Sequence, residues 1–346
     1  MPSLTESQMR QHMDKEEIGS LYFLYGEEKY TLKQAAKKLM KKSGADNFPE
    51  FNFHEFKNET AMEQIVDAAV ALPLMSERKC VAVSDFNLDE KKADEIKRFQ
   101  DLIENVPDST VLIFYYPTLD FDAKKAAKWK KWIKKIAEIG TAAEYKPRSA
   151  SELEQMMIRR AEKAGCSLSK RNAAVLVDYV GTDIKPLLTE IEKLTAFADG
   201  KEVSLEMIDS MVTKSIEATA FMLSAELIAG NYGKAMAYMD ELFYRREEPI
   251  MILGALSSAY VDMYRVRAAL QSGKPYNAPA EYGDYRGREF RLQKAERSVR
   301  RLPMKALRST MELLLETDIK LKSSKSDPRV IMDTLIAKLL FIAKEA

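Results

Sequence analysis

The chain has 346 residues and a formal net charge of +1, with 46% hydrophobic and 31% charged residues. This apolar content excludes an intrinsically disordered protein, and the near-neutral average shows no global attraction to nucleic acid. At about 150 residues per domain, the length indicates two or three domains. Two cysteines are too few for a disulfide framework, and no apolar run approaches the roughly 18–20 residues of a membrane span, so we expect a cytoplasmic protein.

Residues 18 to about 146 alternate short apolar runs with helical patterns, which predicts an α/β domain at residues 1–146 whose parallel sheet is buried on both faces. The predicted strands are Leu21–Tyr25, Phe51–Phe53, Cys80–Val83, Val111–Tyr115 and Ala142–Tyr145. The predicted helices cover residues 29–42, 60–71, 90–105 and 123–139. Cys80 lies within one of these apolar runs and is interpreted as a small buried hydrophobic residue.

Strand patterns stop near residue 146, and residues 147–213 predict a small helical domain. Ser151 with Glu154 is interpreted as a capping box, and Ser169 as the cap of the next helix. Asp183 is expected to begin a third helix, and a short fourth follows.

Residues 214–346 predict a second, larger helical domain. Its expected helices cover residues 216–229, 233–246, 249–272, 286–300, 303–325 and 328–344. The charges differ by zone, because the first two zones each carry a net charge of −2 and the last carries +5. The densest basic stretch supplies candidate DNA-facing residues, with an ordinary solvated helix surface as the alternative: Arg286, Arg288, Arg291, Lys294 and Arg297.

The junction after the first strand is where a phosphate-binding loop would lie. It reads Gly26, Glu27, Glu28 and Lys29, without the Gly-Lys-Ser/Thr ending of a working loop. Carboxylates at a helix N-terminus repel an anion and satisfy the helix dipole themselves. We therefore interpret these four residues as a degenerate loop that binds no nucleotide.

Other catalytic signatures are also missing from the sequence. Asp85 follows a strand but lacks a neighbouring acid, so it is interpreted as a strand-end cap. The chain has two histidines and no zinc-binding or serine-hydrolase motif. We expect no catalytic site, no metal, no cofactor and no small-molecule substrate.

Two segments allow both a structural and a functional interpretation. Lys124–Lys135 combines seven lysines with two tryptophans, which suits either a DNA-facing helix or a solvated face over a core stripe. Leu74 and Met75 follow Pro73 in a short connector. They either pack onto the domain's own core or form an exposed apolar wedge for a partner's pocket.

Several segments together resemble the delta subunit of the bacterial DNA polymerase III clamp loader. The resemblance begins at LYFLYGEEKYTL and extends to the terminal helices. Its most specific part is Gly181-Thr182-Asp183-Ile184 followed by Glu190-Ile191-Glu192-Lys193-Leu194. Glu247-Glu248-Pro249-Ile250, Asp318-Ile319-Lys320 and Lys325-Ser326-Asp327 add to it.

The resemblance implies an AAA+-like domain without a functional phosphate-binding loop at 1–146, a helical lid at 147–213 and a helical collar at 214–346. It implies a subunit of a DNA-directed DNA polymerase, a nucleotidyltransferase complex, that works at replication forks on the nucleoid. The implied partners are the sliding clamp, other clamp-loader subunits and primed DNA. The family's clamp-contacting element corresponds to Leu74 and Met75, where other members often have an aromatic residue at the second position.

Three alternatives remain open at this point. The chain could be an active AAA+ ATPase, although Gly26–Lys29 argues against that. It could be a DNA-binding regulator with a helical C-terminal domain, although no basic recognition helix stands out. It could also be an interaction protein of unrelated function.

Overall fold

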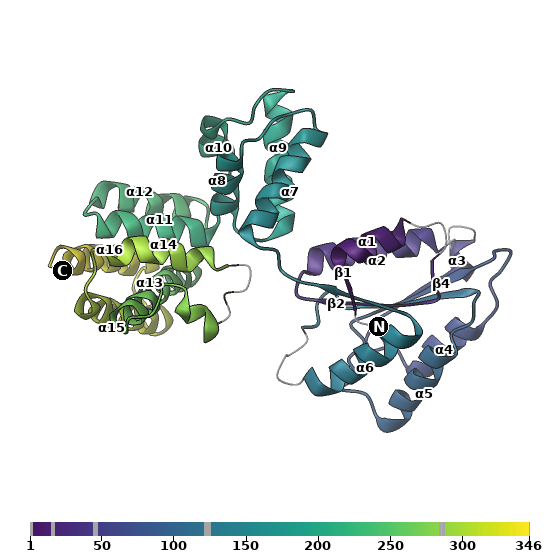
Figure 1. Ribbon diagram of the computed structural model, residues 1–346. Coiled ribbons are helices and arrows are strands. Elements are labelled where there is room, and N and C mark those ends of the chain that lie inside the picture. Colours follow the sequence, from purple (N-terminus) through teal and green to yellow (C-terminus); the bar gives the residue numbers. More distant parts are fainter. Residues whose placement is uncertain are drawn as a thin grey trace. The chain divides into compact units, whose positions relative to one another are not determined.

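The computed structural model describes residues 3–14, 18–43, 48–120, 126–283, 285 and 288–345. The chain divides into two compact units, Met1–Pro147 and Arg148–Ala346 (Figure 1). The first is an α/β unit and the second is helical, as the sequence predicted. Of the helices in these described ranges, none combines the length and the apolar character that a membrane span requires.

The first unit is built on a parallel sheet. In the described part of the chain the sheet has six strands in the order β1-β6-β2-β5-β4-β3, and each neighbouring pair is parallel. The strands are β1 (Leu4–Thr5), β2 (Leu21–Gly26), β3 (Phe53–Phe56), β4 (Lys79–Ser84), β5 (Thr110–Tyr115) and β6 (Thr141–Tyr145). Since all strands run the same way, the segments that precede them share one edge of the sheet, here called the amino edge.

Helices cover both faces of this sheet (Figure 1). One face packs against α1 (Glu6–Met13) and α2 (Lys29–Lys42), and the other against α4 (Met62–Val70), α5 (Ala93–Glu104) and α6 (Ala126–Ile139). Within β4, Cys80 and Ala82 join the first core, whereas Val81 and Val83 join the second. Burial raises the pKa of the Cys80 thiol to about 12, which agrees with its interpretation as a buried hydrophobic residue.

The prediction of a strand at Phe51–Phe53 was wrong at its start. Residues Pro49–Asn52 form the short helix α3, and pairing in the sheet begins at Phe53, opposite Cys80. Pro49 occupies the first helical turn, where its fixed φ and missing N–H are tolerated. Phe51 is therefore an exposed residue beside the sheet.

The second unit begins with four helices: α7 (Ala150–Lys163), α8 (Lys170–Val180), α9 (Ile184–Ala198) and α10 (Leu205–Met211). The predicted caps at Ser169 and Asp183 are confirmed, because each side chain accepts a backbone N–H of the following turn. The capping box of the first helix is formed by Ser149 and Glu152, so its assignment to Ser151 and Glu154 was wrong. That helix starts earlier because Ser149 and Glu152 satisfy each other's backbone N–H groups.

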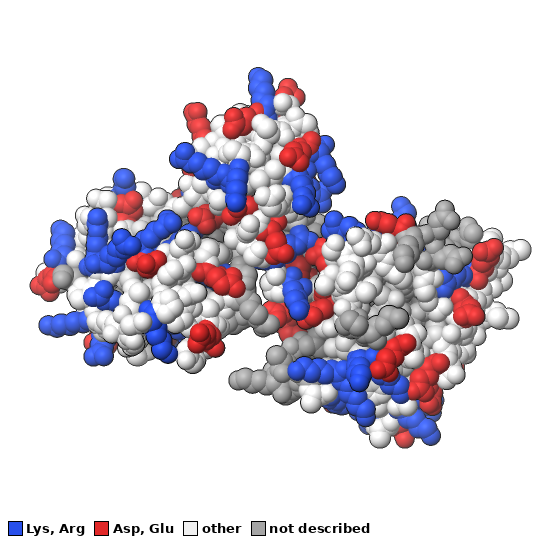
Figure 2. Space-filling view, viewed as in Figure 1, with Lys and Arg blue, Asp and Glu red and all other residues white. Residues whose placement is uncertain are grey.

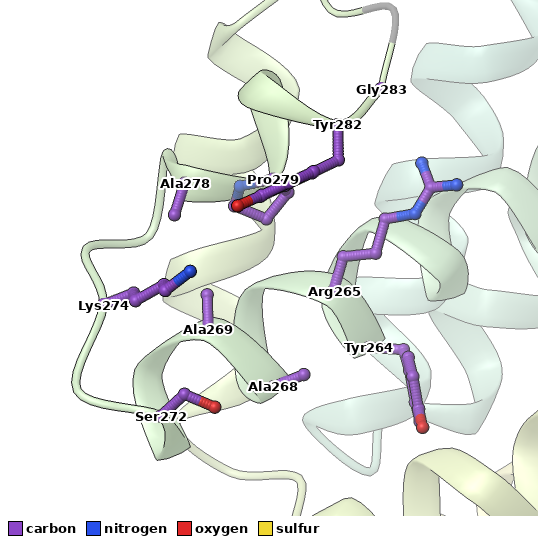
Figure 3. A pocket seen from close by; sticks show the side chains of 10 residues that line it. All are labelled: Tyr264, Arg265, Ala268, Ala269, Ser272, Lys274, Ala278, Pro279, Tyr282 and Gly283. Atoms are coloured by element: carbon purple, nitrogen blue, oxygen red, sulfur yellow. The ribbon is translucent and has the colours of Figure 1, made fainter.

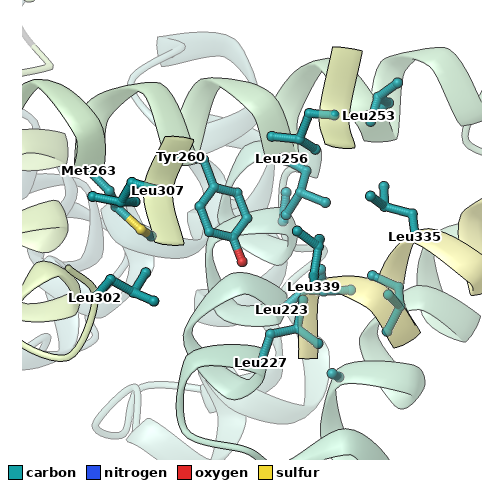
Figure 4. Packing of buried hydrophobic residues seen from close by; sticks show 14 of the residues in the cluster. Leu223, Leu227, Leu253, Leu256, Tyr260, Met263, Leu302, Leu307, Leu335 and Leu339 are labelled. Atoms are coloured by element: carbon teal, nitrogen blue, oxygen red, sulfur yellow. The ribbon is translucent and has the colours of Figure 1, made fainter. Parts of the chain in front are cut away.

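The rest of the second unit is α11 (Ile216–Ile228), α12 (Tyr232–Tyr244), α13 (Pro249–Gln271), the 3₁₀ helix η1 (Ala278–Glu281), α14 (Phe290–Val299), α15 (Met304–Ser323) and α16 (Pro328–Lys344). Leucine-rich faces of these helices share one core around α13 (Figure 4). Leu256, Tyr260 and Met263 of α13 are almost completely buried in it. Helix α8 also contacts α11, and the division at residue 213 stays a prediction.

Candidate functional site

The loop of residues 71–78, here called the wedge loop, connects α4 to β4 at the amino edge of the sheet. Its apolar side chains are exposed: Leu72 by 86%, Leu74 by 44% and Met75 by 80%. The sequence left open whether Leu74 and Met75 pack on their own core. The structure presents both to solvent, which is the arrangement a partner-binding wedge requires.

The end of α4, where the wedge loop starts, is held by two side chains from neighbouring strands. The Thr110 hydroxyl donates a hydrogen bond to the Ala69 carbonyl at 2.8 Å, and the Lys79 ammonium donates one to the Ala68 carbonyl. Lys79 is 1% exposed, and this burial lowers its pKa. Both contacts satisfy carbonyls at a helix C-terminus, so the loop leaves α4 from a fixed point.

Arg78 holds the other end of the wedge loop. Its guanidinium donates hydrogen bonds to the carbonyls of Ile18 at 2.7 Å, Gly19 at 3.2 Å and Asp108 at 3.2 Å. These three residues directly precede β2 and β5. The Arg78 side chain thus connects the wedge loop to the segments before β2 and β5. Its planar guanidinium carries several N–H donors, which suits it to bond several carbonyls at once.

The middle of the wedge loop is held by Asn52, the last residue of α3. Its side-chain amide donates to the Leu74 carbonyl, and its side-chain oxygen accepts the Leu74 N–H, each at 2.8 Å. Asn52 is fully buried, whereas the Leu74 side chain remains partly exposed. Met75 follows with a φ of 49°, a left-handed conformation that costs a non-glycine residue on the order of 1–3 kcal/mol.

The degenerate phosphate-binding loop lies at the opposite edge of the sheet, after β2. Gly26 has a φ of 135°, and a Cβ there would lie 2.1 Å from the Tyr145 carbonyl oxygen, so the backbone requires glycine. The Glu28 carboxylate accepts the Thr31 N–H at 3.3 Å. The N-terminus of α2 is therefore capped by a negative charge of the chain itself.

Lys29 does not reach toward a phosphate position. Its ammonium donates hydrogen bonds to the Leu119 carbonyl at 2.6 Å and the Tyr116 carbonyl at 3.3 Å, and it pairs with Asp120 at 3.1 Å. These contacts connect α2 to the segment after β5. Glu27, the remaining residue of the loop, is exposed.

We expect the isolated chain to bind no ATP, because Glu28 occupies the anion position at the N-terminus of α2. Isothermal titration of the full chain with ATP and Mg²⁺ should give only the heat of dilution. The same titration with a P-loop ATPase provides the positive control. A saturable heat in the micromolar range would contradict this prediction.

The predicted basic cluster separates into two kinds of residue. Arg291 pairs with the buried Asp262 of α13 at 2.7 Å, and Lys294 pairs with Asp178 of α8 at 3.1 Å. Arg288 and Arg297 are exposed. Arg286 lies outside the described residues. At least two of the five candidate DNA-facing residues thus have intramolecular ionic partners.

The lysine-rich helix fits its structural interpretation. Trp129 and Trp132 are buried, and the Trp129 indole N–H donates to Asp89 at 2.9 Å. Figure 2 shows basic side chains gathered over α6 with acidic ones beside them. Lys128, Lys130, Lys131 and Lys134 are exposed above the buried tryptophans, which agrees with a solvated face over a core stripe. The segment's first residues, 124 and 125, lie outside the described residues.

Asp85 also has a structural role. Its carboxylate accepts the backbone N–H groups of Thr118 at 3.0 Å and Leu119 at 2.8 Å. These bonds connect the end of β4 to the segment after β5, so the role of Asp85 is structural, but the N–H groups that it caps do not belong to β4. The described ranges contain no cluster of three or more His, Cys, Asp or Glu residues that could hold a metal ion.

Sequence reasoning missed two features. One is a pocket of about 370 Å³ between the end of α13 and η1, lined in part by Arg265, Lys274 and Tyr282 (Figure 3). It shares no residue with the predicted sites. The other is the pairing of Asn52 with Leu74, which no local sequence pattern signals because the two residues lie 22 positions apart.

Comparison with known proteins gives consistent matches along the chain. Residues 22–144 match the family model described as DNA polymerase III, delta subunit, and residues 217–339 match that of the DNA polymerase III delta subunit, C-terminal domain. DNA polymerase III subunit delta of Bacillus subtilis (strain 168) is 25% identical over 336 residues, covering 95% of both chains.

Two further matches agree with these. The probable DNA polymerase III subunit delta of Aquifex aeolicus (strain VF5) is 22% identical over 271 residues, covering 75% of this chain and 74% of the relative. The solved structure of the Bacillus subtilis DNA clamp loader delta protein has a similar fold, with a TM-score of 0.67 at 22% identity. It covers 97% of this chain and 99% of that structure.

Proposed function

Because this chain belongs to the DNA polymerase III delta subunit family, we propose that it is a clamp-loader subunit that binds the sliding clamp and opens its ring for loading onto primed DNA. The exposed wedge of Leu74 and Met75 is the observation that carries the proposal. An apolar pair on a loop held at both ends and in the middle suits insertion into a partner's pocket. Each buried side chain of this size contributes about 1.5–3 kcal/mol.

Ring opening follows from differential affinity. A wedge that binds the open form of the ring more tightly than the closed form shifts the ring toward opening, and only by the difference between the two affinities. A mobile loop would lose part of that difference to ordering entropy on binding. The contacts of Arg78 and Asn52 reduce this loss, which supports a role in opening as well as in binding.

The chain performs no ATP hydrolysis of its own in this proposal, because Glu28 caps the helix where phosphate would bind. Energy from ATP enters through other clamp-loader subunits of a hetero-oligomer. The helices of residues 214–346 serve as the collar that joins those subunits. The complex acts in the cytoplasm, at replication forks on the nucleoid, and the chain contacts primed DNA as part of it.

The proposal is tested with the full chain and the sliding clamp of the same organism. Surface plasmon resonance should show saturable binding without ATP. A fluorophore pair placed across one interface of the ring should report its separation when the chain is added. Absence of binding would refute the proposal, and binding without separation would restrict it to clamp attachment.

A further inference from the structure

Two exposed aromatic residues lie at the same edge of the sheet as the wedge loop. Phe48 and Phe51 are 46% and 55% exposed. Phe51 belongs to α3, which directly precedes β3, and the wedge loop directly precedes β4. Because β3 and β4 pair in parallel, with Phe53 opposite Cys80, the two segments enter the sheet side by side (Figure 1).

The two Asn52 hydrogen bonds connect these segments directly. They link the Asn52 side chain to both backbone polar groups of Leu74, 22 positions further along the chain. Phe51 is the chain neighbour of Asn52, and consecutive Cα atoms lie about 3.8 Å apart. The backbone of Phe51 is therefore held next to the segment that carries Leu74. A buried side-chain amide is costly to leave without hydrogen-bond partners, so the folded state favours keeping both Asn52 hydrogen bonds formed.

We propose that α3 and the wedge loop form one continuous partner-binding surface. In this surface Asn52 positions Leu74, and Phe51 supplies a further apolar contact to the partner that receives Leu74 and Met75. The proposal rests on the proposed function, because it takes the sliding clamp as the partner. Contiguous exposed apolar residues mark interaction sites more reliably than scattered ones, and large aromatic side chains are frequent among the residues that dominate binding. We therefore expect the sliding clamp to have an apolar strip next to the pocket that receives Leu74 and Met75.

The contact is tested by Phe51→Ala, measured against the immobilised clamp with the full chain. We expect affinity to fall about tenfold or more, as for the loss of a buried aromatic contact. Phe197→Ala is the matched control, because Phe197 is a similarly exposed phenylalanine, at 62%, on α9. Its affinity should equal that of the unmodified chain. Thermal unfolding of both variants establishes that they fold.

The outcomes separate the two proposals. If Phe51→Ala binds like Phe197→Ala while replacement of Leu74 and Met75 abolishes binding, the extended surface is refuted and the proposed function stands. If the unmodified chain does not bind the clamp, the proposed function fails as well.

The positioning role of Asn52 is tested by a double-mutant cycle with Leu74. Asn52→Ala should weaken binding in the unmodified chain and weaken it less when Leu74 is already alanine, because part of its effect is the placement of the Leu74 side chain. Asn52→Asp keeps an oxygen that can accept the Leu74 N–H, but it places a carboxylate oxygen against the Leu74 carbonyl. We therefore expect a loss of affinity between those of the unmodified chain and Asn52→Ala. Equal losses from Asn52→Ala in both backgrounds would overturn the positioning role.

Discussion

Replacing Leu74 and Met75 together by alanine is expected to abolish binding to the sliding clamp while the chain keeps its fold. Both side chains are substantially exposed, at 44% and 80%, and surface substitutions usually change stability by no more than about 0.5 kcal/mol. In the complex, the pair would lose roughly 3–6 kcal/mol of apolar burial. That corresponds to an affinity weaker by about two to four orders of magnitude.

Surface plasmon resonance against the immobilised ring measures the loss, and circular dichroism melting checks the fold. The matched control replaces Leu315 and Ile319 by alanine, because this apolar pair on α15 is exposed by 62% and 56%. The control variant should bind the ring like the unmodified chain. Unchanged affinity in the Leu74 and Met75 variant would disprove the wedge.

Replacing Arg291 by alanine is expected to lower the free energy of unfolding by about 3 kcal/mol. Asp262 is 4% exposed, and both its oxygens are engaged, one by the Arg291 guanidinium and one by the Tyr285 hydroxyl. Removal of one partner of a buried ion pair leaves an uncompensated charge, which costs roughly 3–5 kcal/mol. The lower end applies because the Arg291 side chain is itself 26% exposed.

Urea unfolding of the full chain measures this effect. Arg297→Ala is the matched control, since Arg297 lies on the same helix and is exposed. We expect it to change stability by no more than about 0.5 kcal/mol. Equal stability of the two variants would contradict the structural role of Arg291 and return it to the candidate DNA-facing residues.

The architecture of the first unit could be predicted from the sequence because its determinants are local. Runs such as Cys80–Val83 are apolar at every position, which is typical of a strand buried on both faces. Helix boundaries depended on nearby side chains, and Asp183 capped its helix as expected. The predictions at Phe51 and Ser149 were wrong by a few residues, where neighbouring residues offered competing local solutions. The strand β1 and the helix α1 were not predicted at all.

The inability of Gly26–Lys29 to form a phosphate-binding loop was also readable from the sequence, because that chemistry needs particular residues at fixed spacing. The tertiary structure decided the rest of the site. The backbone of Leu74 is bonded by Asn52, 22 residues earlier, and the guanidinium of Arg291 is bonded by Asp262, 29 residues earlier. A sequence pattern reports how polar a residue is and what adjoins it. Only the folded chain determines which distant group satisfies a buried amide or carboxylate, and therefore which side chains remain free for a partner.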